Sequence, residues 1–344
     1  ATWFYATNNL ADGTVTVINH ATQTEVARTL VGSNPTRIIA SPNGSRVYVS
    51  NLNSDTVSVL DTSSHTVIAT IPVGDKPETM AITANGAKLY VINYDGQTVS
   101  VVDTATNTEI VQVPCGEKAK GIEISPDGRW VYVANRGSGS VTVIDTFSDT
   151  VQTTIIGVGG GNRVLFNLDG SKAYVATGTG VSVIDVATHL LIKKLAAGDK
   201  PIDMVLVHSA SRLFVGNVST SDVTVVDTIT DEVLTTVTGT GLGPWRLAAS
   251  PDSSTVYAAC SRSDTLSIID VATLTVRQNV LVGDGAFYVA VSSDGSKVYT
   301  TNPPASSVSS VQIDLSADPP ATSVVNLLTR KNPWAMITVD TPDS

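Results

Sequence analysis

Residues 131–135 read Val-Tyr-Val-Ala-Asn, and close variants of this phrase recur along the whole chain. The aromatic residue of the phrase returns at steps of 40 to 43 residues, eight times in 344 residues. Self-similarity at this period is typical of propellers, solenoids and arrays, whose repeats share one continuous core. Positions where the copies agree are interpreted as architecture, and positions where they differ are candidates for function. The aromatic positions are Tyr5, Tyr48, Tyr90, Tyr132, Tyr174, Phe214, Tyr257 and Tyr299.

Residues 77–113 contain one complete repeat and predict four short strands. Asn85-Gly86 and Asp95-Gly96 are tight-turn pairs that separate apolar segments. The segments between the turns are rich in β-branched residues, as strands are. Four antiparallel strands joined by short turns make one propeller blade. The expected strands are 80–83, 88–93, 99–103 and 109–113.

The spacing predicts a single all-β domain over residues 1–344, an eight-bladed β-propeller with four antiparallel strands in each blade. A seven-bladed ring is the alternative. The chain begins on a second strand, near residues 3–8, and ends on a first strand, 334–340. We expect the last strand to pair with the N-terminal blade, because this pairing closes the ring and removes exposed strand edges. The expected blades are 3–30 with 334–340, 35–72, 77–113, 119–156, 161–195, 201–238, 244–281 and 286–329.

Two polar positions repeat in nearly every copy and are interpreted as architecture. An aspartate ends most third strands, where its short carboxylate caps backbone N–H groups of the next turn. An asparagine ends most second strands, and we expect it to hydrogen-bond local backbone. The aspartates are Asp61, Asp103, Asp145, Asp185, Asp227, Asp270 and Asp314, and the asparagines are Asn8, Asn51, Asn93, Asn135, Asn217 and Asn302.

The repeated motifs resemble those of the YVTN family of β-propeller repeats. The resemblance rests on the Tyr-Val-x-Asn phrase, the Ser-Pro-Asp-Gly turn at 125–128 and the Val-Thr-Val-Ile-Asp-Thr strand at 141–146. That family occurs in archaeal surface-layer proteins and in exported bacterial proteins, so the resemblance implies a secreted, periplasmic or cell-surface location. Many members have seven blades, and eight-bladed relatives include the haem-binding domain of certain nitrite reductases. The resemblance covers essentially the whole chain but says little about function, because one fold hosts many functions.

Composition excludes several classes of function. The net charge of −10 argues against a nucleic-acid-binding protein, which needs a basic face. No run of about 18 apolar residues occurs, so no membrane span is expected. The four histidines fall in turns on the face opposite the channel mouth or at the outer rim, which argues against a His-ligated haem or metal at the mouth. We predict no metal site and no cofactor, and we expect a monomer. The histidines are His20, His65, His189 and His208.

One ring of positions does not repeat. It comprises the two residues that follow the conserved proline position at the entry to each first strand, on the face that surrounds the central channel. Aromatic residues fall on three consecutive blades and charged residues on the remaining arc, so we expect the aromatic rings to stack a ligand and the arginines to hold an anionic group. A purely structural interpretation is also open, in which the aromatic residues fill space and the charges pair with each other. The predicted site consists of Arg37, Glu78, Lys120, Arg163, Asp203, Trp245, Arg246, Phe287, Tyr288 and Trp334.

Three functions are compatible with this ring. The first is an exported propeller that binds a planar, sugar-like or anionic small molecule, or a protein partner, at the channel mouth. The alternative is an enzyme of the lyase, isomerase or hydrolase type, with Glu78, Lys120 and Asp203 as candidate acid–base residues. The third is a structural module of a surface layer or a larger assembly. The sequence leaves open whether the protein is an enzyme.

Overall fold

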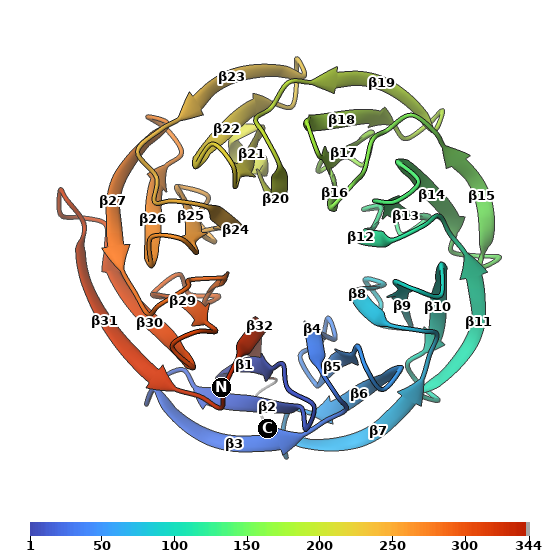
Figure 1. Ribbon diagram of the computed structural model, residues 1–344, viewed down its shortest axis with the longest axis horizontal. Coiled ribbons are helices and arrows are strands. Elements are labelled where there is room, and N and C mark those ends of the chain that lie inside the picture. The colour runs from blue at the N-terminus through green and yellow to red at the C-terminus, as the bar shows by residue number, and fades with distance from the viewer. Residues whose placement is uncertain (342–344) are drawn as a thin grey trace.

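The structure is a computed structural model that describes residues 1–341. Eight sheets of four antiparallel strands surround a central axis, as Figure 1 shows. The predicted eight-bladed, all-β propeller is confirmed. No helix within the described residues is both long and apolar enough to cross a membrane.

The strands of each blade follow from the innermost to the outermost. Blade 1 contains β32 (Pro333–Asp340), β1 (Thr2–Asn8), β2 (Thr14–Asn19) and β3 (Thr24–Leu30), and blade 2 contains β4 (Pro35–Ala40), β5 (Arg46–Asn51), β6 (Thr56–Asp61) and β7 (Thr66–Pro72). Blade 3 contains β8 (Pro77–Ile82), β9 (Lys88–Asn93), β10 (Thr98–Asp103) and β11 (Thr108–Pro114), and blade 4 contains β12 (Ala119–Ile124), β13 (Trp130–Asn135), β14 (Ser140–Asp145) and β15 (Thr150–Ile155).

Blade 5 contains β16 (Arg163–Phe166), β17 (Lys172–Thr177), β18 (Gly180–Asp185) and β19 (Leu190–Leu195), and blade 6 contains β20 (Pro201–Val207), β21 (Arg212–Asn217), β22 (Asp222–Asp227) and β23 (Glu232–Val237). Blade 7 contains β24 (Pro244–Ala249), β25 (Thr255–Cys260), β26 (Thr265–Asp270) and β27 (Thr275–Leu281), and blade 8 contains β28 (Tyr288–Val291), β29 (Lys297–Asn302), β30 (Ser307–Asp314) and β31 (Ala321–Leu328). One short 3₁₀ turn, η1 (His208–Ala210), joins β20 to β21.

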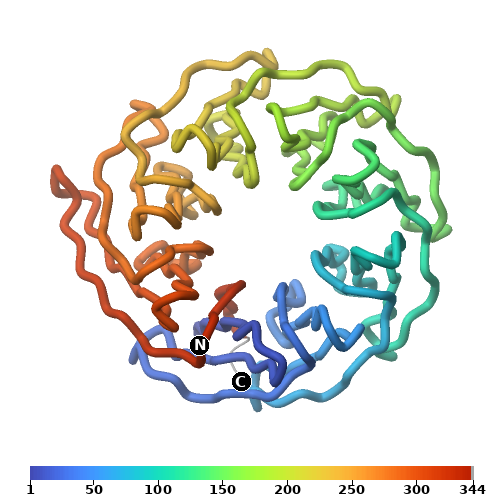
Figure 2. The backbone as a smooth tube through the Cα atoms, in the orientation of Figure 1, coloured from blue at the N-terminus to red at the C-terminus, as the bar shows by residue number. Residues whose placement is uncertain are grey.

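The ring closes within blade 1, as the sequence predicts. Strand β32 pairs antiparallel with β1, from Thr2 opposite Asp340 to Asn8 opposite Pro333. Figure 2 shows this last segment of the chain lying inside the first. Closure satisfies the inner edge of β1 with main-chain hydrogen bonds, which removes an exposed edge from the fold.

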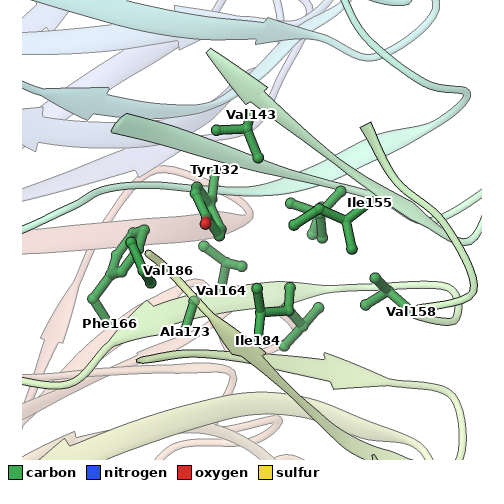
Figure 3. Packing of buried hydrophobic residues seen from close by; sticks show 12 residues of the cluster. Tyr132, Val143, Ile155, Val158, Val164, Phe166, Ala173, Ile184 and Val186 are labelled. Carbon is green, nitrogen blue, oxygen red and sulfur yellow. The ribbon is translucent and has the colours of Figure 1, made fainter. Parts of the chain in front are cut away.

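The hydrophobic core lies between neighbouring blades. In the cluster drawn in Figure 3, Tyr132 and Val143 of blade 4 pack against Val164 and Ile184 of blade 5. All four residues are fully buried. Each blade therefore buries its apolar faces against its two neighbours, which is why the repeats fold as one unit.

The repeated aspartates cap their turns, as expected. Asp61 Oδ1, for example, accepts hydrogen bonds from the backbone N–H groups of Ser63 and Ser64, both at 2.9 Å. Most of the asparagines differ from the expectation of backbone partners. Asn93 Nδ2 donates to the hydroxyls of Thr98 (2.9 Å) and Ser100 (2.8 Å) on the next strand.

The asparagine position also explains a conserved glycine of the repeat. A Cβ atom added to Gly74 would lie 2.3 Å from Asn93 Nδ2. The loop can therefore cover the asparagine only where the entering chain has no side chain. Gly74 precedes the first strand of blade 3 and Asn93 ends the second strand of the same blade, so the contact forms when these two strands pair.

The ring of blades has two faces, each formed by a different set of loops. The upper face carries the loops that enter the first strands and those that follow the second strands. The lower face carries the turns between first and second strands and between third and fourth strands. We call the region enclosed by the eight first strands the central channel, and its end at the upper face the channel mouth.

On the lower face, hydroxyls of the repeated tyrosines bond side chains of the next blade. Tyr5 bonds His65 Nδ1 at 2.8 Å, and Tyr132 bonds His189 Nδ1 at 2.7 Å. Tyr299 bonds His20 Nδ1 at 2.8 Å across the closure between blades 8 and 1. We call these contacts the inter-blade latches. They give three of the four histidines a structural partner away from the channel mouth.

Candidate functional site

The predicted ring of residues sits on an irregular stretch of backbone. In most of the blades the register between the first and second strands shifts just after the conserved proline position, for example between Pro244 and Arg246. Such a bulge leaves one residue unpaired and changes the direction of its side chain. Trp245 is the unpaired residue in blade 7. The bulge therefore lets Trp245 and its neighbour Arg246 contact different groups.

Three of the four predicted aromatic residues form one continuous stack across blades 7, 8 and 1. The rings of Trp245 and Phe287 lie 5.0 Å apart between centroids, and those of Phe287 and Trp334 lie 4.4 Å apart. All three side chains remain partly exposed. The planes of the rings are tilted by 31° and 41° to one another, so they form a row of aromatic side chains against which a ligand can pack.

Tyr288 is not part of this stack. Its ring packs in the apolar clusters beside blade 1, and the Arg246 guanidinium lies 5.4 Å from the ring centroid. This distance is typical of a cation–π contact. Tyr288 therefore holds Arg246 rather than extending the aromatic stack.

Glu78 lies between two cations on the charged arc. Its Oε1 atom is 2.5 Å from Lys120 Nζ and 3.7 Å from an Arg37 guanidinium nitrogen. Burial lowers the pKa of Lys120, and the nearby Glu78 carboxylate opposes this effect. Lys120 Nζ also lies 5.0 Å from the centroid of the Tyr94 ring, a contact that the sequence analysis missed.

A second ion pair joins blades 5, 6 and 7. Arg163 Nε is 3.6 Å from Asp203 Oδ1, and Asp203 Oδ2 accepts a hydrogen bond from the Leu247 backbone N–H at 3.0 Å. Asp203 is only 5% exposed. Its carboxylate is thus occupied on both oxygens by neighbouring blades.

Arginines from different blades influence one another within the channel. Burial lowers the pKa of Arg37, and the positive charges of Arg246 and Arg163 lower it further. Burial acts against the positive charge of Arg163 as well, but the carboxylates of Asp203 and Glu123 outweigh it and raise the pKa. An anion that entered between these guanidiniums would relieve their mutual repulsion.

The three candidate acid–base residues are not brought together as one set. Glu78 contacts Lys120, whereas Asp203 belongs to the separate pair with Arg163. Each of the three is engaged by a partner of opposite charge. An acid–base group has to exchange a proton with substrate, and these contacts compete with that role.

A cavity of about 460 Å³ extends along the first strands of blades 4 to 7 towards the lower face. It was not anticipated from the sequence. Burial raises the pKa of Glu123, which lines the cavity, while the positive charge of Arg163 partly offsets the effect. The other residues discussed here that line it are Leu165, Met204, Leu206, His208 and Leu247.

The repeat contained a signal for Glu123 that the sequence analysis did not use. The equivalent position is aliphatic in the seven other copies, so Glu123 is an isolated carboxyl in an apolar series. His208 was assigned to a lower-face turn, which η1 confirms, but it also reaches the cavity. Within the described residues, no group of three or more His, Cys, Asp or Glu side chains is arranged to hold a metal ion. The seven aliphatic residues are Ile39, Ala81, Leu165, Val205, Ala248, Ala290 and Ile337.

The fold and the channel define the protein as a β-propeller with a polar, partly aromatic central site. The sequence profile of the YNCE-like β-propeller matches residues 71–179 and 173–320, and the chain belongs to this family. The profile of the seven-bladed β-propeller lactonases matches residues 4–113, although the ring here has eight blades. No curated protein matches the chain significantly.

Solved structures share the architecture at low sequence identity. The dihydro-heme d1 dehydrogenase NirN, solved in complex with DHE, is 15% identical with a TM-score of 0.78, over 97% of this chain and 74% of that one. Hydrazine synthase of Kuenenia stuttgartiensis is 22% identical with a TM-score of 0.66, over 85% and 95%. A Bacteroides fragilis protein proposed to be a 6-phosphogluconolactonase is 15% identical with a TM-score of 0.67, over 98% of both chains. At these identities the likeness concerns the fold alone.

Proposed function

We propose that this protein binds a small anionic molecule with a planar or sugar-like body in its central channel. The observation that carries the proposal is the ring stack Trp245–Phe287–Trp334, which shares the channel entrance with a group of interacting arginines. The rings would support the body of the ligand, and the guanidiniums would hold its charge.

The balance of charge in the predicted ring supports an anionic ligand. The ring contains four cations (Arg37, Lys120, Arg163, Arg246) and two carboxylates (Glu78, Asp203), whereas the whole chain has a net charge of −10. A local excess of positive charge in a concave, partly buried region attracts anions more strongly than the same charges on an open surface. The excess is therefore opposite in sign to the rest of the protein.

Binding without catalysis is the function that the geometry supports best. Glu78, Lys120 and Asp203 make ion pairs with each other or with Arg163, and Asp203 also accepts a backbone N–H. These contacts stabilise the arrangement of the blades and leave no obvious free base. We propose export to the periplasm or cell surface and a monomeric state on the family resemblance.

A lyase- or hydrolase-type activity is a second candidate, and Glu123 is the observation that favours it. A carboxyl with a raised pKa beside a cavity is a recognised feature of acid–base sites. The match to lactonase profiles and the solved structure proposed to be a 6-phosphogluconolactonase make a sugar-acid lactone the first substrate to test. Glu123→Gln would abolish such turnover while leaving ligand binding in place.

Assembly through the rim is a further candidate. The ends of the outermost strands of blades 7, 8 and 1 expose Leu281, Leu328 and Leu30. Exposed large apolar side chains on three consecutive blades favour a protein contact surface. Analytical ultracentrifugation of wild type and Leu328→Ser distinguishes this function from ligand binding in a monomer.

The channel proposal is tested by titrating a panel of sugar phosphates, sugar acids and aromatic carboxylates by calorimetry. Phe287→Ala and Trp334→Ala should weaken binding about tenfold, equivalent to ~1.4 kcal/mol, because each removes part of the stack. Phe147→Ala is the matched control, since Phe147 is a 79% exposed aromatic residue in a turn of the lower face. Equal affinities for all three variants would exclude the mouth as the binding site.

A further inference from the structure

A second pocket lies on the lower face, outside the channel, between blades 2 and 3. Its volume is about 450 Å³. It is bordered by the turns between the first and second strands of both blades, by the start of β5 and by the turn after β10. The lining residues used in the argument are Ser41, Arg46, Tyr48, Asn85 and Thr104.

In two other pairs of blades, a carboxylate joins the equivalents of Arg46 and Tyr48. Between blades 3 and 4, Asp149 Oδ2 lies 2.7 Å from Lys88 Nζ, and Asp149 Oδ1 accepts a hydrogen bond from the Tyr90 hydroxyl at 2.8 Å. Lys88 also donates to the Thr146 carbonyl at 2.9 Å. The carboxylate thus uses both oxygens to link the cation and the tyrosine of the preceding blade.

The same arrangement recurs between blades 5 and 6. Asp231 Oδ2 lies 2.6 Å from Lys172 Nζ, and Asp231 Oδ1 accepts from the Tyr174 hydroxyl at 2.8 Å. Lys172 donates to the Thr228 carbonyl at 3.1 Å. Two independent copies therefore show the same set of four groups: a cation, a tyrosine, a threonine carbonyl and a carboxylate.

Between blades 2 and 3 the carboxylate is missing from this set. Arg46 donates to the Thr104 carbonyl at 2.6 Å, as its counterparts do. Asn107 occupies the position of Asp149 and Asp231, and its buried Oδ1 atom has no hydrogen-bond partner within the described residues. In the same part of the chain, residues 1–341, Arg46 makes no ion pair and the Tyr48 hydroxyl makes no hydrogen bond, although Tyr48 is only 1% exposed.

In two other blade pairs, the residue at the position of Asp149 and Asp231 suits the second-strand residues that it contacts. Where the second strand brings Trp130 and Tyr132, the next blade supplies His189, which bonds the Tyr132 hydroxyl. Where it brings Phe214, the next blade supplies Leu274 to the same apolar cluster.

A cation and a tyrosine also face a neutral amide, Gln23, between blades 8 and 1, but there His20 bonds the Tyr299 hydroxyl at 2.8 Å. Between blades 2 and 3 the Tyr48 hydroxyl has no such substitute within the described residues, and the unmatched groups coincide with a pocket.

We propose that the pocket between blades 2 and 3 binds a small organic carboxylate, which takes the place that the Asp149 and Asp231 carboxylates have in the other two pairs. One oxygen would lie against the Arg46 guanidinium, and the other would accept the Tyr48 hydroxyl. A planar guanidinium suits a carboxylate because it offers two N–H donors in a fixed geometry.

The pocket also indicates the kind of molecule that carries the carboxylate. Its volume exceeds that of a bare carboxylate group and falls in the range of ordinary small-molecule sites. Ser41, Asn85 and Thr104 border the remaining space with hydroxyl and amide groups. A short, hydroxylated organic acid therefore fits better than an apolar one. This site is separate from the channel, and the inference does not depend on the proposed channel ligand.

The test uses gluconate, a hydroxylated carboxylate, in thermal unfolding of the full chain. Sodium chloride at equal ionic strength and uncharged glucose are the solution controls. Gluconate at ten times its Kd should raise the Tm of the wild type by roughly 1–2 °C, because it binds only the folded state. Arg46→Gln and the milder Tyr48→Phe should reduce or remove this shift.

Asn107→Asp is the decisive variant, because it restores the set of groups found in the other two blade pairs. It should raise the Tm in sodium chloride alone. Arg246→Gln weakens any binding of gluconate in the channel, so the part of the shift that survives in this variant is assigned to the pocket, and Asn107→Asp added to Arg246→Gln should remove that part. An unchanged gluconate shift when Asn107→Asp is added to Arg246→Gln, no shift in the wild type, or complete loss of the shift in Arg246→Gln alone would overturn the proposal.

Discussion

The lower face and the channel mouth are built from the same eight copies of the repeat. On the lower face most copies supply a hydrogen-bond partner for a tyrosine of the preceding blade, whereas at the channel mouth the copies supply residues of different kinds. On the lower face, Tyr90 and Tyr174 meet aspartates, whereas Tyr5 and Tyr132 meet histidines. Each of these four hydroxyls bonds a side chain of the next blade, and the contacts stabilise the ring of blades. Between blades 2 and 3, within the described residues, the Tyr48 hydroxyl and Asn107 Oδ1 are exceptions.

At the mouth, by contrast, neighbouring blades place aromatic rings and like charges close together. Burial and the positive charges of Arg246 and Arg163 lower the pKa of Arg37. The carboxylates on this arc, Glu78 and Asp203, are fewer than the cations around them. Clustered like charges cost stability in a protein without ligand. The contacts that hold the blades together therefore lie on the lower face, and the proposed channel site lies on the upper face of the same repeats.

The largest effect is expected from removing the strand that closes the ring. A chain ending at residue 332 lacks β32 and its buried residues Ala335, Met336 and Val339. It leaves the inner edge of β1 unpaired, so we expect loss of the cooperative monomeric fold. Size-exclusion chromatography and thermal unfolding measure this, with a chain ending at residue 341 as the control. A monomeric, cooperatively unfolding product of the shorter chain would contradict the importance of closure.

The contribution of the tyrosine hydroxyls on the lower face is tested by removing one hydroxyl at a time. Tyr174→Phe should lower the free energy of unfolding by about 1.5–3 kcal/mol, because the hydroxyl bonds a charged, largely buried Asp231. Tyr48→Phe is the matched control in carboxylate-free buffer, where the change should stay within about 0.5 kcal/mol. Urea unfolding gives both values. Equal losses in the two variants would mean that the hydroxyl contacts do not distinguish the blade pairs.

A smaller effect is expected from the histidines of the lower face. Burial lowers the pKa of His65 and of His189, and the nearby carboxylates of Asp61 and Asp185 offset this only in part. Burial also lowers the pKa of His20, with a further contribution from Lys297. The unfolded chain then binds more protons, so stability is complete above about pH 6.5 and falls as the pH drops towards the lowered native pKa values.

The measurement for the histidines is urea unfolding at several values between pH 7.5 and pH 5.5. Combined replacement of His65 and His189 by Gln should flatten the dependence on pH, although stability at pH 7.5 falls. The channel variant Trp334→Ala should keep the wild-type slope. A slope that survives the double replacement would assign the pH dependence to other groups.

The smallest effect on stability is expected in the channel. Arg246→Gln removes one of the like charges that act on Arg37, so we expect a change between zero and a gain of about 1 kcal/mol. The same variant should weaken binding of an anionic channel ligand. Calorimetric titration and urea unfolding of the same preparation measure both quantities. A loss of stability together with unchanged binding would reverse the roles assigned to the two faces.

Much of the architecture could be predicted from the sequence because each copy reports on the others. The step of 40 to 43 residues and the incomplete first blade led to eight blades and to closure by residues 334–340, and both were confirmed. The aspartate caps were predictable for a local reason, since the carboxylate bonds backbone only two and three residues away. The expected backbone partner occurs at Asn8, which donates to the Thr14 carbonyl at 3.4 Å. It is wrong for Asn93, because hydroxyls of the following strand compete with backbone for the amide.

The site was predicted less completely. The ring of non-repeating residues was found, and three of its aromatic residues lie in contact. Tyr288 was grouped with them but packs against Arg246 and blade 1, because successive side chains of an extended chain point to opposite sides. Glu123 was not predicted, because it lies two residues beyond the ring of non-repeating residues at the entry to the first strands. Its position is aliphatic in the seven other copies.

The number of blades, their strands, their order and the closing of the ring follow from local sequence patterns that repeat at a fixed interval. Which side chains pair between blades becomes visible in the folded ring. Tyr48 and Tyr90 occupy the same position in their blades, but within the described residues only the Tyr90 hydroxyl is hydrogen-bonded, because the next blade presents Asp149 to Tyr90 and Asn107 to Tyr48. The physical reason is that a hydrogen bond or an ion pair acts over about 3 Å, whereas these partners are about 60 residues apart in sequence.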